Sequence, residues 1–106
     1  MPSPSRGEVW LTDLGYVAKV RPCLVLSVAF SETERSLLTL VPHTTSPRAS
    51  RFEVPLAVPY LKAGVFDSQS IVTVPPVRLI RRLGVLKAEE LQAVEVSVKA
   101  WLGLRT

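Results

Sequence analysis

The chain is organised around one apolar run that opens with an arginine and a proline, Arg21-Pro22-Cys23-Leu24-Val25-Leu26-Ser27. From Cys23 to Phe30 the only polar side chain is Ser27, and a short apolar run rich in valine and leucine is typical of a strand covered on both faces. Proline has no N–H to donate to a strand ladder, so Pro22 belongs at the first residue of this strand. Arg21 is therefore expected at the rim of the sheet, as a cation that a ligand can reach.

The composition favours one small globular domain over residues 1–106. Hydrophobic residues make up 47% of the chain, and nine prolines with five glycines indicate many turns. Charged residues or prolines interrupt every apolar run far short of the roughly 20 residues that cross a bilayer, so we expect no membrane association. The N-terminus, Met1-Pro2-Ser3-Pro4-Ser5, shows no secretion signal, and a cytoplasmic protein is expected.

The numbers of cysteine, histidine and charged residues limit the kinds of site that the chain can form. Cys23 is the only cysteine and His43 the only histidine, which excludes a disulfide within the chain and argues against a Cys/His metal cluster. We therefore expect no metal and no cofactor. Thirteen Lys and Arg against nine Asp and Glu give a net charge of +4, a modest excess that favours a polyanionic partner.

Hydrophobic periodicity predicts strands followed by one helix. The expected strands cover residues 7–12, 20–29, 37–42, 51–56 and 69–74. In the fourth, Phe52, Val54 and Leu56 face inward while Pro55 points outward, which is typical of an edge strand. Residues 57–67 are expected to be a connection with room for a short helix, and residues 77–83 an irregular extended segment that ends at Gly84.

The period changes near the C-terminus to that of a helix over residues 87–102. Leu91, Val94, Val98 and Trp101 fall on one stripe, and Gly103 is a natural stop. This order of elements predicts a mainly β protein with a C-terminal helix, folded as a small antiparallel barrel that the helix closes.

Few reactive constellations are present. The sequence has no Gly-rich phosphate loop and no matched pair of carboxylates. Antiparallel neighbours place the start of one strand beside the end of the next, so Arg21 can meet the cluster His43-Thr44-Thr45-Ser46 that follows the third strand. A guanidinium and several hydroxyls together suit a phosphate group.

Three segments resemble a known family. They are Arg6-Gly7-Glu8-Val9-Trp10-Leu11-Thr12-Asp13-Leu14, Arg21-Pro22-Cys23-Leu24-Val25-Leu26-Ser27 and Leu40-Val41-Pro42-His43-Thr44-Thr45-Ser46. In order and spacing they are similar to the MazF/PemK family of toxin endoribonucleases, and the similarity continues through Phe52–Leu56 and Arg82-Leu83-Gly84 into the terminal helix.

The resemblance implies an SH3-like barrel related to the gyrase poison CcdB, acting as a homodimer. It implies metal-independent cleavage of single-stranded RNA that leaves a 2′,3′-cyclic phosphate and a 5′-hydroxyl, and an antitoxin protein that occupies the same groove. The family's catalytic arginine and threonine correspond to Arg21 and Thr44. Residues expected to contact the RNA are Thr45, Ser46, Arg48 and Arg78.

The chain departs from the family pattern at two places. The segment Gly15-Tyr16-Val17-Ala18-Lys19-Val20 is shorter than the family's first loop and lacks its carboxylate. Pro75-Pro76 stands where members often carry an Asp-Gln pair before the arginine that aligns with Arg78. These departures keep a second hypothesis open, a non-catalytic binding module of the same fold, either a CcdB-like gyrase poison or a member that only binds antitoxin or RNA.

Several candidate residues also have an ordinary structural interpretation. Arg21 could form only a surface ion pair, and Thr44 could only end a strand. His43 is expected to be non-catalytic because strand alternation turns it away from Thr44. Cys23 is expected to be a small core residue, and Trp101 to pack the helix or to serve a dimer contact. The arginines at 78, 81 and 82 are either a solvated face or part of an RNA track.

Overall fold

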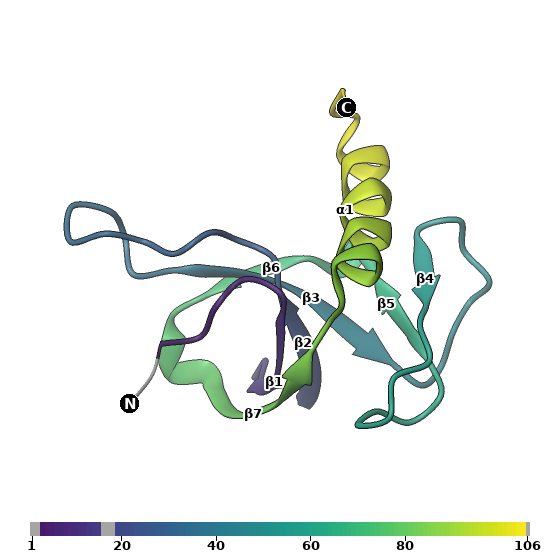
Figure 1. The fold of residues 1–106 in the computed structure, drawn as a ribbon, viewed down its shortest axis with the longest axis horizontal. Helices are drawn as coiled ribbons and strands as arrows, with labels where there is room; N and C mark the ends of the chain where they lie inside the picture. The colour runs from purple at the N-terminus through teal and green to yellow at the C-terminus, as the bar shows by residue number, and fades with distance from the viewer. Residues whose placement is uncertain (1–2, 16–18, 106) are drawn as a thin grey trace.

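A computed structural model describes residues 3–15 and 19–105 of the chain. The structure is one antiparallel sheet with a single α-helix at the C-terminal end (Figure 1). The elements in chain order are β1 (Glu8–Asp13), β2 (Val20–Val25), β3 (Leu38–Thr44), β4 (Glu53–Pro55), β5 (Val65–Asp67), the 3₁₀ turn η1 (Ser68–Ser70), β6 (Val72–Val74), the 3₁₀ turn η2 (Pro76–Arg78), β7 (Leu79–Val85) and α1 (Ala88–Leu102). The expected class, mainly β with a C-terminal helix, is confirmed.

The sheet is open, so the prediction of a closed barrel is wrong. Its strand order is β4-β5-β3-β2-β1-β7, and β6 pairs with β3 outside this path. Two strands pair with the same edge of β3: β6 lies beside Leu38–Leu40, and β5 lies beside His43–Thr44. Pro75 and Pro76 follow β6 directly and have no N–H groups, so the chain makes the turn η2 before β7 begins. Among the described residues β4 and β7 each pair with one strand only, and they form the two ends of the sheet.

Apolar side chains pack on both faces of the sheet. On one face Val9, Leu24 and Val41 pack with Val94 and Val98 of α1, and Phe66 is fully buried among them. On the other face Trp10, Cys23 and Val25 form a second cluster. Because alternate residues of β2 and β3 enter different clusters, these two strands carry apolar side chains on both faces, as the sequence predicts.

The helix begins and ends close to the predicted bounds of 87 and 102. The Glu90 carboxylate accepts a hydrogen bond of 2.8 Å from the Lys87 backbone N–H, which caps the first turn. Gly103 ends the helix in the left-handed conformation, with φ of 69°. Arg6 ties the helix to the N-terminal segment, since its guanidinium pairs with Glu95 and also donates to the Leu26 carbonyl oxygen.

Several strand boundaries differ from the predictions. β2 ends at Val25 instead of residue 29 because the Ser27 hydroxyl accepts the Thr39 N–H at 2.9 Å, which replaces a ladder hydrogen bond. Residues 57–67 hold the strand β5 instead of a helix, and β3 extends to Thr44 beyond its predicted end at residue 42.

The last two extended segments also differ from their predicted form. Residues 69 and 70 belong to η1 instead of a strand because the Asp67 carboxylate accepts the Gln69 N–H at 3.1 Å and caps a 3₁₀ turn. β7 does not end at Gly84 but continues to Val85. A Cβ at Gly84 would lie 2.5 Å from Cζ of Tyr60, so the glycine is needed for the close approach of Tyr60 and not to stop the strand. Within the short first loop over residues 15–20, residues 16–18 lie outside the described residues.

Strand β4 confirms the predicted edge. It pairs only with β5 among the described residues, and Pro55 is exposed while Val54 is half-buried and packs against the core. A proline on this outer edge removes a donor that no neighbouring strand needs.

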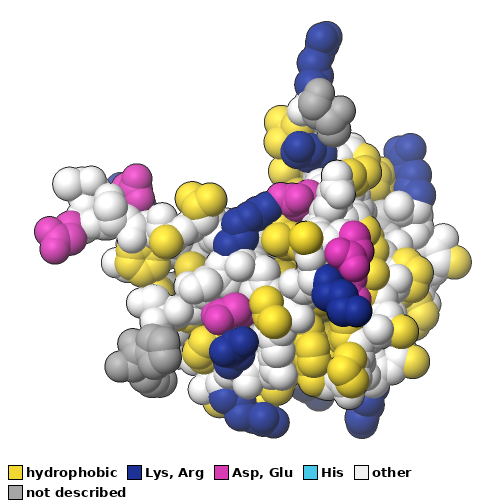
Figure 2. All heavy atoms as spheres, viewed as in Figure 1, with side chains coloured by type: hydrophobic (Ala, Val, Ile, Leu, Met, Phe, Trp, Pro, Cys, Tyr) yellow, Lys and Arg dark blue, Asp and Glu magenta, His cyan; other side chains and the backbone are white. Residues whose placement is uncertain are grey.

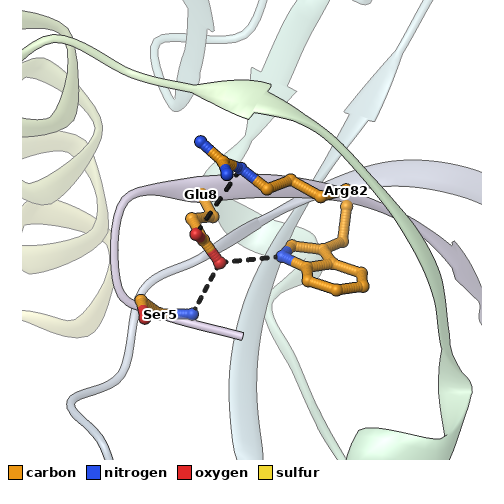
Figure 3. Close-up of polar contacts among 4 residues, drawn as sticks. Ser5, Glu8 and Arg82 are labelled. Atoms are coloured by element: carbon orange, nitrogen blue, oxygen red, sulfur yellow. Dashed lines mark hydrogen bonds and ion pairs between the residues drawn. The ribbon is translucent and has the colours of Figure 1, made fainter. Parts of the chain in front are cut away.

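Glu8 joins the N-terminal segment, β1 and β7 (Figure 3). One carboxylate oxygen accepts the Ser5 N–H at 2.7 Å and the Trp10 indole N–H at 3.0 Å, and the other lies 3.5 Å from Nε of Arg82. Burial would raise the pKa of Glu8, but these hydrogen bonds and the arginine charge outweigh it, so the pKa is lowered. Glu8 is therefore held ionised between the two strands.

The surface carries charges of both signs. On the face shown in Figure 2, Lys and Arg side chains are scattered around the molecule and do not gather in one patch. Within residues 3–15 and 19–105, no helix combines the length and the apolar character that crossing a membrane requires.

Candidate functional site

A groove of about 950 Å³ crosses the β4–β5–β3–β2 part of the sheet. Its lining combines two arginines, two carboxylates, an amide and four hydroxyls with five apolar residues. The lining residues are Leu14, Arg21, Pro42, Thr44, Ser46, Arg48, Ser50, Glu53, Asp67, Gln69, Ser70, Ile71, Val72 and Trp101.

Strand register brings Arg21 and Thr44 together in this groove. β2 pairs with β3 so that Cys23 lies opposite Pro42 and Leu24 opposite Val41. Continued for two more residues, the same register sets Arg21 opposite Thr44. Directly opposed residues of antiparallel strands point to one face with Cβ atoms about 5 Å apart. Both residues are half-buried and both line the groove.

The same face continues across β5 and β4. Thr44 lies opposite Val65, and Asp67, two residues further along β5, points to the same side as Val65. Glu53 lies opposite Asp67. Four strands therefore each contribute one polar side chain to a single face of the sheet.

The Thr44 hydroxyl is oriented by the backbone that follows it. Its oxygen accepts a hydrogen bond of 3.1 Å from the Ser46 N–H. A hydroxyl accepts through its oxygen and donates through its hydrogen, so this contact leaves the hydrogen of Thr44 available to a ligand in the groove. The arrangement is a local turn, and it fixes a donor beside Arg21.

Glu53 shapes the turn that carries Arg48. Both of its carboxylate oxygens lie 3.0 Å from the Arg48 N–H, and one also accepts the Ser50 N–H at 3.0 Å. Ala49 between them adopts a left-handed conformation with φ of 56°, which is costly for a residue with a Cβ. The carboxylate therefore stabilises a strained turn and holds Arg48 at the groove.

Asp67 and Gln69 supply a carboxylate and an amide that sequence analysis did not place in the site. The Asp67 carboxylate accepts the Gln69 N–H and also the Ser70 hydroxyl at 2.7 Å, so it is occupied by its own turn. The Gln69 side chain is exposed in the groove. The Asp-Ser-Gln-Ser sequence, typical of a capped turn, was the available signal.

The predicted site residues do not all meet. Arg21, Thr44, Ser46 and Arg48 line the groove, whereas Thr45 and Arg78 are exposed residues outside its lining. Arg78 ends η2, and its Nη1 lies 3.6 Å from the position of a Cβ on Gly15. Arg78 is therefore beside the β1–β2 connection, next to Leu14 at one border of the groove.

His43 lies on the opposite face of β3 from Thr44, as alternation predicts. Its side chain is 2% exposed and its ring contacts Phe66 edge-on, with centroids 5.1 Å apart. Burial lowers the pKa of His43, and within the described part of the chain its Nε2 has no hydrogen-bond partner. A buried neutral imidazole cannot take a proton from a ligand in the groove.

Cys23 is a core residue, as the sequence predicts. Its side chain is fully buried, and burial raises the pKa of the thiol to about 11 against smaller opposing effects of Thr12 and Arg21. Among the residues described here, no group of three His, Cys, Asp or Glu side chains is arranged to hold a metal ion.

The chain is similar over nearly its whole length to known proteins. It resembles a MazE–MazF complex from Deinococcus radiodurans at 26% identity and a TM-score of 0.78, with 99% of this chain and 100% of that chain covered. It resembles the Mycobacterium tuberculosis toxin MazF-mt6 at 27% identity and a TM-score of 0.79, covering 93% and 99%. A mycobacterial endoribonuclease in complex with its cognate antitoxin shares the fold at 24% identity and a TM-score of 0.83, covering 98% and 99%.

The family resemblance stated from the sequence is confirmed by a match that covers residues 5–102. The chain belongs to the PemK-like, MazF-like toxins of type II toxin-antitoxin systems.

Proposed function

We propose that this toxin is an endoribonuclease that cleaves single-stranded RNA in the groove between Arg21 and Thr44. Family membership supports the toxin role, and a solved structure of similar fold is described as an endoribonuclease. The observation that carries the proposal is the juxtaposition of a guanidinium with an oriented hydroxyl on one face of the sheet.

The proposed reaction needs no group beyond the RNA itself as nucleophile. The ribose 2′-oxygen attacks the adjacent phosphorus, the bond from phosphorus to the 5′-oxygen breaks, and the products are a 2′,3′-cyclic phosphate and a 5′-hydroxyl. The proton lost from the 2′-hydroxyl is balanced by the one that the 5′-oxygen gains. Negative charge grows on the non-bridging oxygens as the attack proceeds. Arg21 stabilises this charge by charge-assisted hydrogen bonds, and Thr44 donates a further one.

Arg21→Ala tests the central assignment. We expect loss of cleavage with an unchanged melting temperature, because Arg21 lies at the strand end and is only half-buried. Arg35→Ala is the matched control, since Arg35 is an exposed arginine outside the groove lining. The assay incubates the protein with a long single-stranded RNA in EDTA and maps the new ends. Cleavage retained by Arg21→Ala would remove Arg21 from the reaction.

Thr44→Val separates the hydroxyl from the shape of the side chain. Removing one donor to a developing oxyanion commonly lowers kcat by about 10²-fold or more. Thr44→Ser keeps the hydroxyl and the bond to the Ser46 N–H, so it should retain most of the activity. Equal rates for the two variants would show that the hydroxyl takes no part.

The proposal also includes the cellular location, the oligomeric state and the protein partner of this toxin. We place the toxin in the cytoplasm as a homodimer, with a cognate antitoxin that covers the groove and blocks RNA. Solved relatives include a MazE–MazF complex and an endoribonuclease with its cognate antitoxin. Intact RNA together with stalled supercoiling would instead assign the chain to the gyrase poisons, and the end-mapping assay distinguishes the two.

A further inference from the structure

Trp101 is an aromatic side chain in the lining of the groove. The chain has two tryptophans: Trp10 is 8% exposed in the core, whereas Trp101 is 41% exposed and lines the groove. Trp101 lies in the last turn of α1, and Gly103 ends the helix two residues later. The predicted role in helix packing accounts for only part of this side chain, since much of the indole remains open to a ligand.

The indole is held in place by a second aromatic ring. Phe52 contacts Trp101 edge-on, with ring centroids 5.3 Å apart and an angle of 60° between the planes. Arg51 in turn places its guanidinium 4.5 Å from the centre of the Phe52 ring. Such an edge-to-face contact restricts the orientation of both rings, and Trp101 remains 41% exposed. Trp101 therefore presents a positioned aromatic surface and not a loosely attached side chain.

Position relative to the cleavage site decides what this surface can do. Phe52 precedes β4, and β4 is separated from β2 by β5 and β3. Three strand spacings of about 4.8 Å put Trp101 on the order of 14 Å from Arg21. A group bound on Trp101 is thus too far from Arg21 to belong to the scissile phosphate.

We propose that Trp101 stacks a base of the bound RNA at a nucleotide removed from the cleaved bond, an inference that rests on the proposed function. Single-stranded RNA presents unstacked bases, and aromatic side chains bind them by stacking while cations hold the backbone. The groove has both parts, since its lining includes Arg21 and Arg48 as well as Trp101. Trp101 is then a residue for binding and not for the chemical step.

Tryptophan fluorescence tests the contact without cleavage. A 2′-O-methyl oligoribonucleotide cannot react, and its addition to the wild type should quench the emission of Trp101. Trp101→Phe serves as the control, because its remaining signal comes from buried Trp10 and should not respond. Saturating oligonucleotide that binds the wild type without quenching would overturn the proposal.

Kinetics test what the contact contributes. Trp101→Leu should raise KM by roughly 5- to 150-fold, the range expected for one stacked base, and leave kcat unchanged. Trp101→Phe should restore most of the affinity. Leu102→Ala is a matched control, since Leu102 is 48% exposed on the same turn and does not line the groove. Equal KM values for Trp101→Leu and Trp101→Phe would refute stacking.

Sedimentation of the same variants separates stacking from a dimer contact. Trp101→Leu should keep the oligomeric state of the wild type. A dimer that dissociates in Trp101→Leu would assign the side chain to an interface and overturn the proposal. If the oligonucleotide quenches Trp101 but the protein cleaves no RNA, the endonuclease proposal is overturned and the stacking proposal is retained. If the protein cleaves RNA but the oligonucleotide does not quench Trp101, the stacking proposal is overturned and the endonuclease proposal is retained.

Discussion

Replacing Gly64 by alanine tests how tightly β5 is held against the strand that carries Thr44. A Cβ on Gly64 would collide with the Thr44 carbonyl oxygen and lie 2.7 Å from Cε1 of His43. Carbon atoms in contact are about 3.5–4.0 Å apart, so the two segments must separate by roughly 1 Å. Neither obstacle can rotate away, because one is backbone and the other is a side chain that is 2% exposed. Such overpacking costs about 1–3 kcal/mol.

The displacement should be visible in activity as well as in stability. At 106 residues, each kcal/mol lost should lower Tm by about 4 °C or more. A shift of 1 Å in a catalytic group can cost about 10²-fold in rate, so Gly64→Ala should also lower kcat for RNA cleavage. The matched control is Gly103→Ala, where φ of 69° is strained for alanine but nothing lies within 4 Å of the new Cβ.

Thermal melts and cleavage rates of the two variants should therefore diverge. Gly103→Ala should lose about 1–2 kcal/mol of stability from its left-handed conformation and keep the wild-type kcat at temperatures where it is folded. Gly64→Ala should lose both stability and cleavage rate. A Gly64→Ala protein that melts with the wild type would refute the close packing of β5 on β3, and one that melts early but cleaves normally would refute the link to Thr44.

Two further predictions concern ionisable groups. The pKa of Glu8 is below its usual 4.5, since the hydrogen bonds from Trp10 and Ser5 and the charge of Arg82 outweigh burial; the stability it contributes is complete above the unfolded pKa and is lost as pH falls through the folded pKa. Glu8→Gln should therefore flatten the fall of Tm below about pH 5, and parallel curves for the two proteins would contradict this. The Cys23 thiol, buried with a pKa of about 11, should resist iodoacetamide near neutral pH until the chain is unfolded, and equal rates before and after denaturation would count against its burial.

Local patterns in the sequence were sufficient for the central part of the site. The prediction that Pro22 begins the strand is wrong, because β2 starts at Val20 and pairs with β1 from that residue on; antiparallel pairing with β3 nevertheless places Arg21 beside the end of β3. Strand alternation separated His43 from Thr44 because the side-chain period of a strand is two whatever surrounds it. Pro55 marked the edge strand for an equally local reason, its missing N–H.

The rest of the groove depends on contacts between distant segments. β5 has only three residues, Val65–Asp67, which is too short for a periodic signal, and it is a strand because β3 and β4 flank it. Asp67 and Gln69 reach the groove through that pairing. Trp101 lies on the predicted apolar stripe of α1. The core cluster includes Val94 and Val98 of this stripe but not Trp101, so only the tertiary structure shows that Trp101 lines the groove.

Charge in the groove is arranged for local contacts and not for a general attraction of polyanions. The chain carries +4, yet the groove sets Arg21 and Arg48 against Glu53 and Asp67, so the formal charges of its lining cancel. Arg78, expected to contact RNA, ends η2 outside the lining. At physiological salt, charges further than about 8 Å apart are largely screened, so distant cations add little inside the groove. A phosphate is therefore selected by the few donors that strand register and the Glu53-bound turn place within hydrogen-bonding reach.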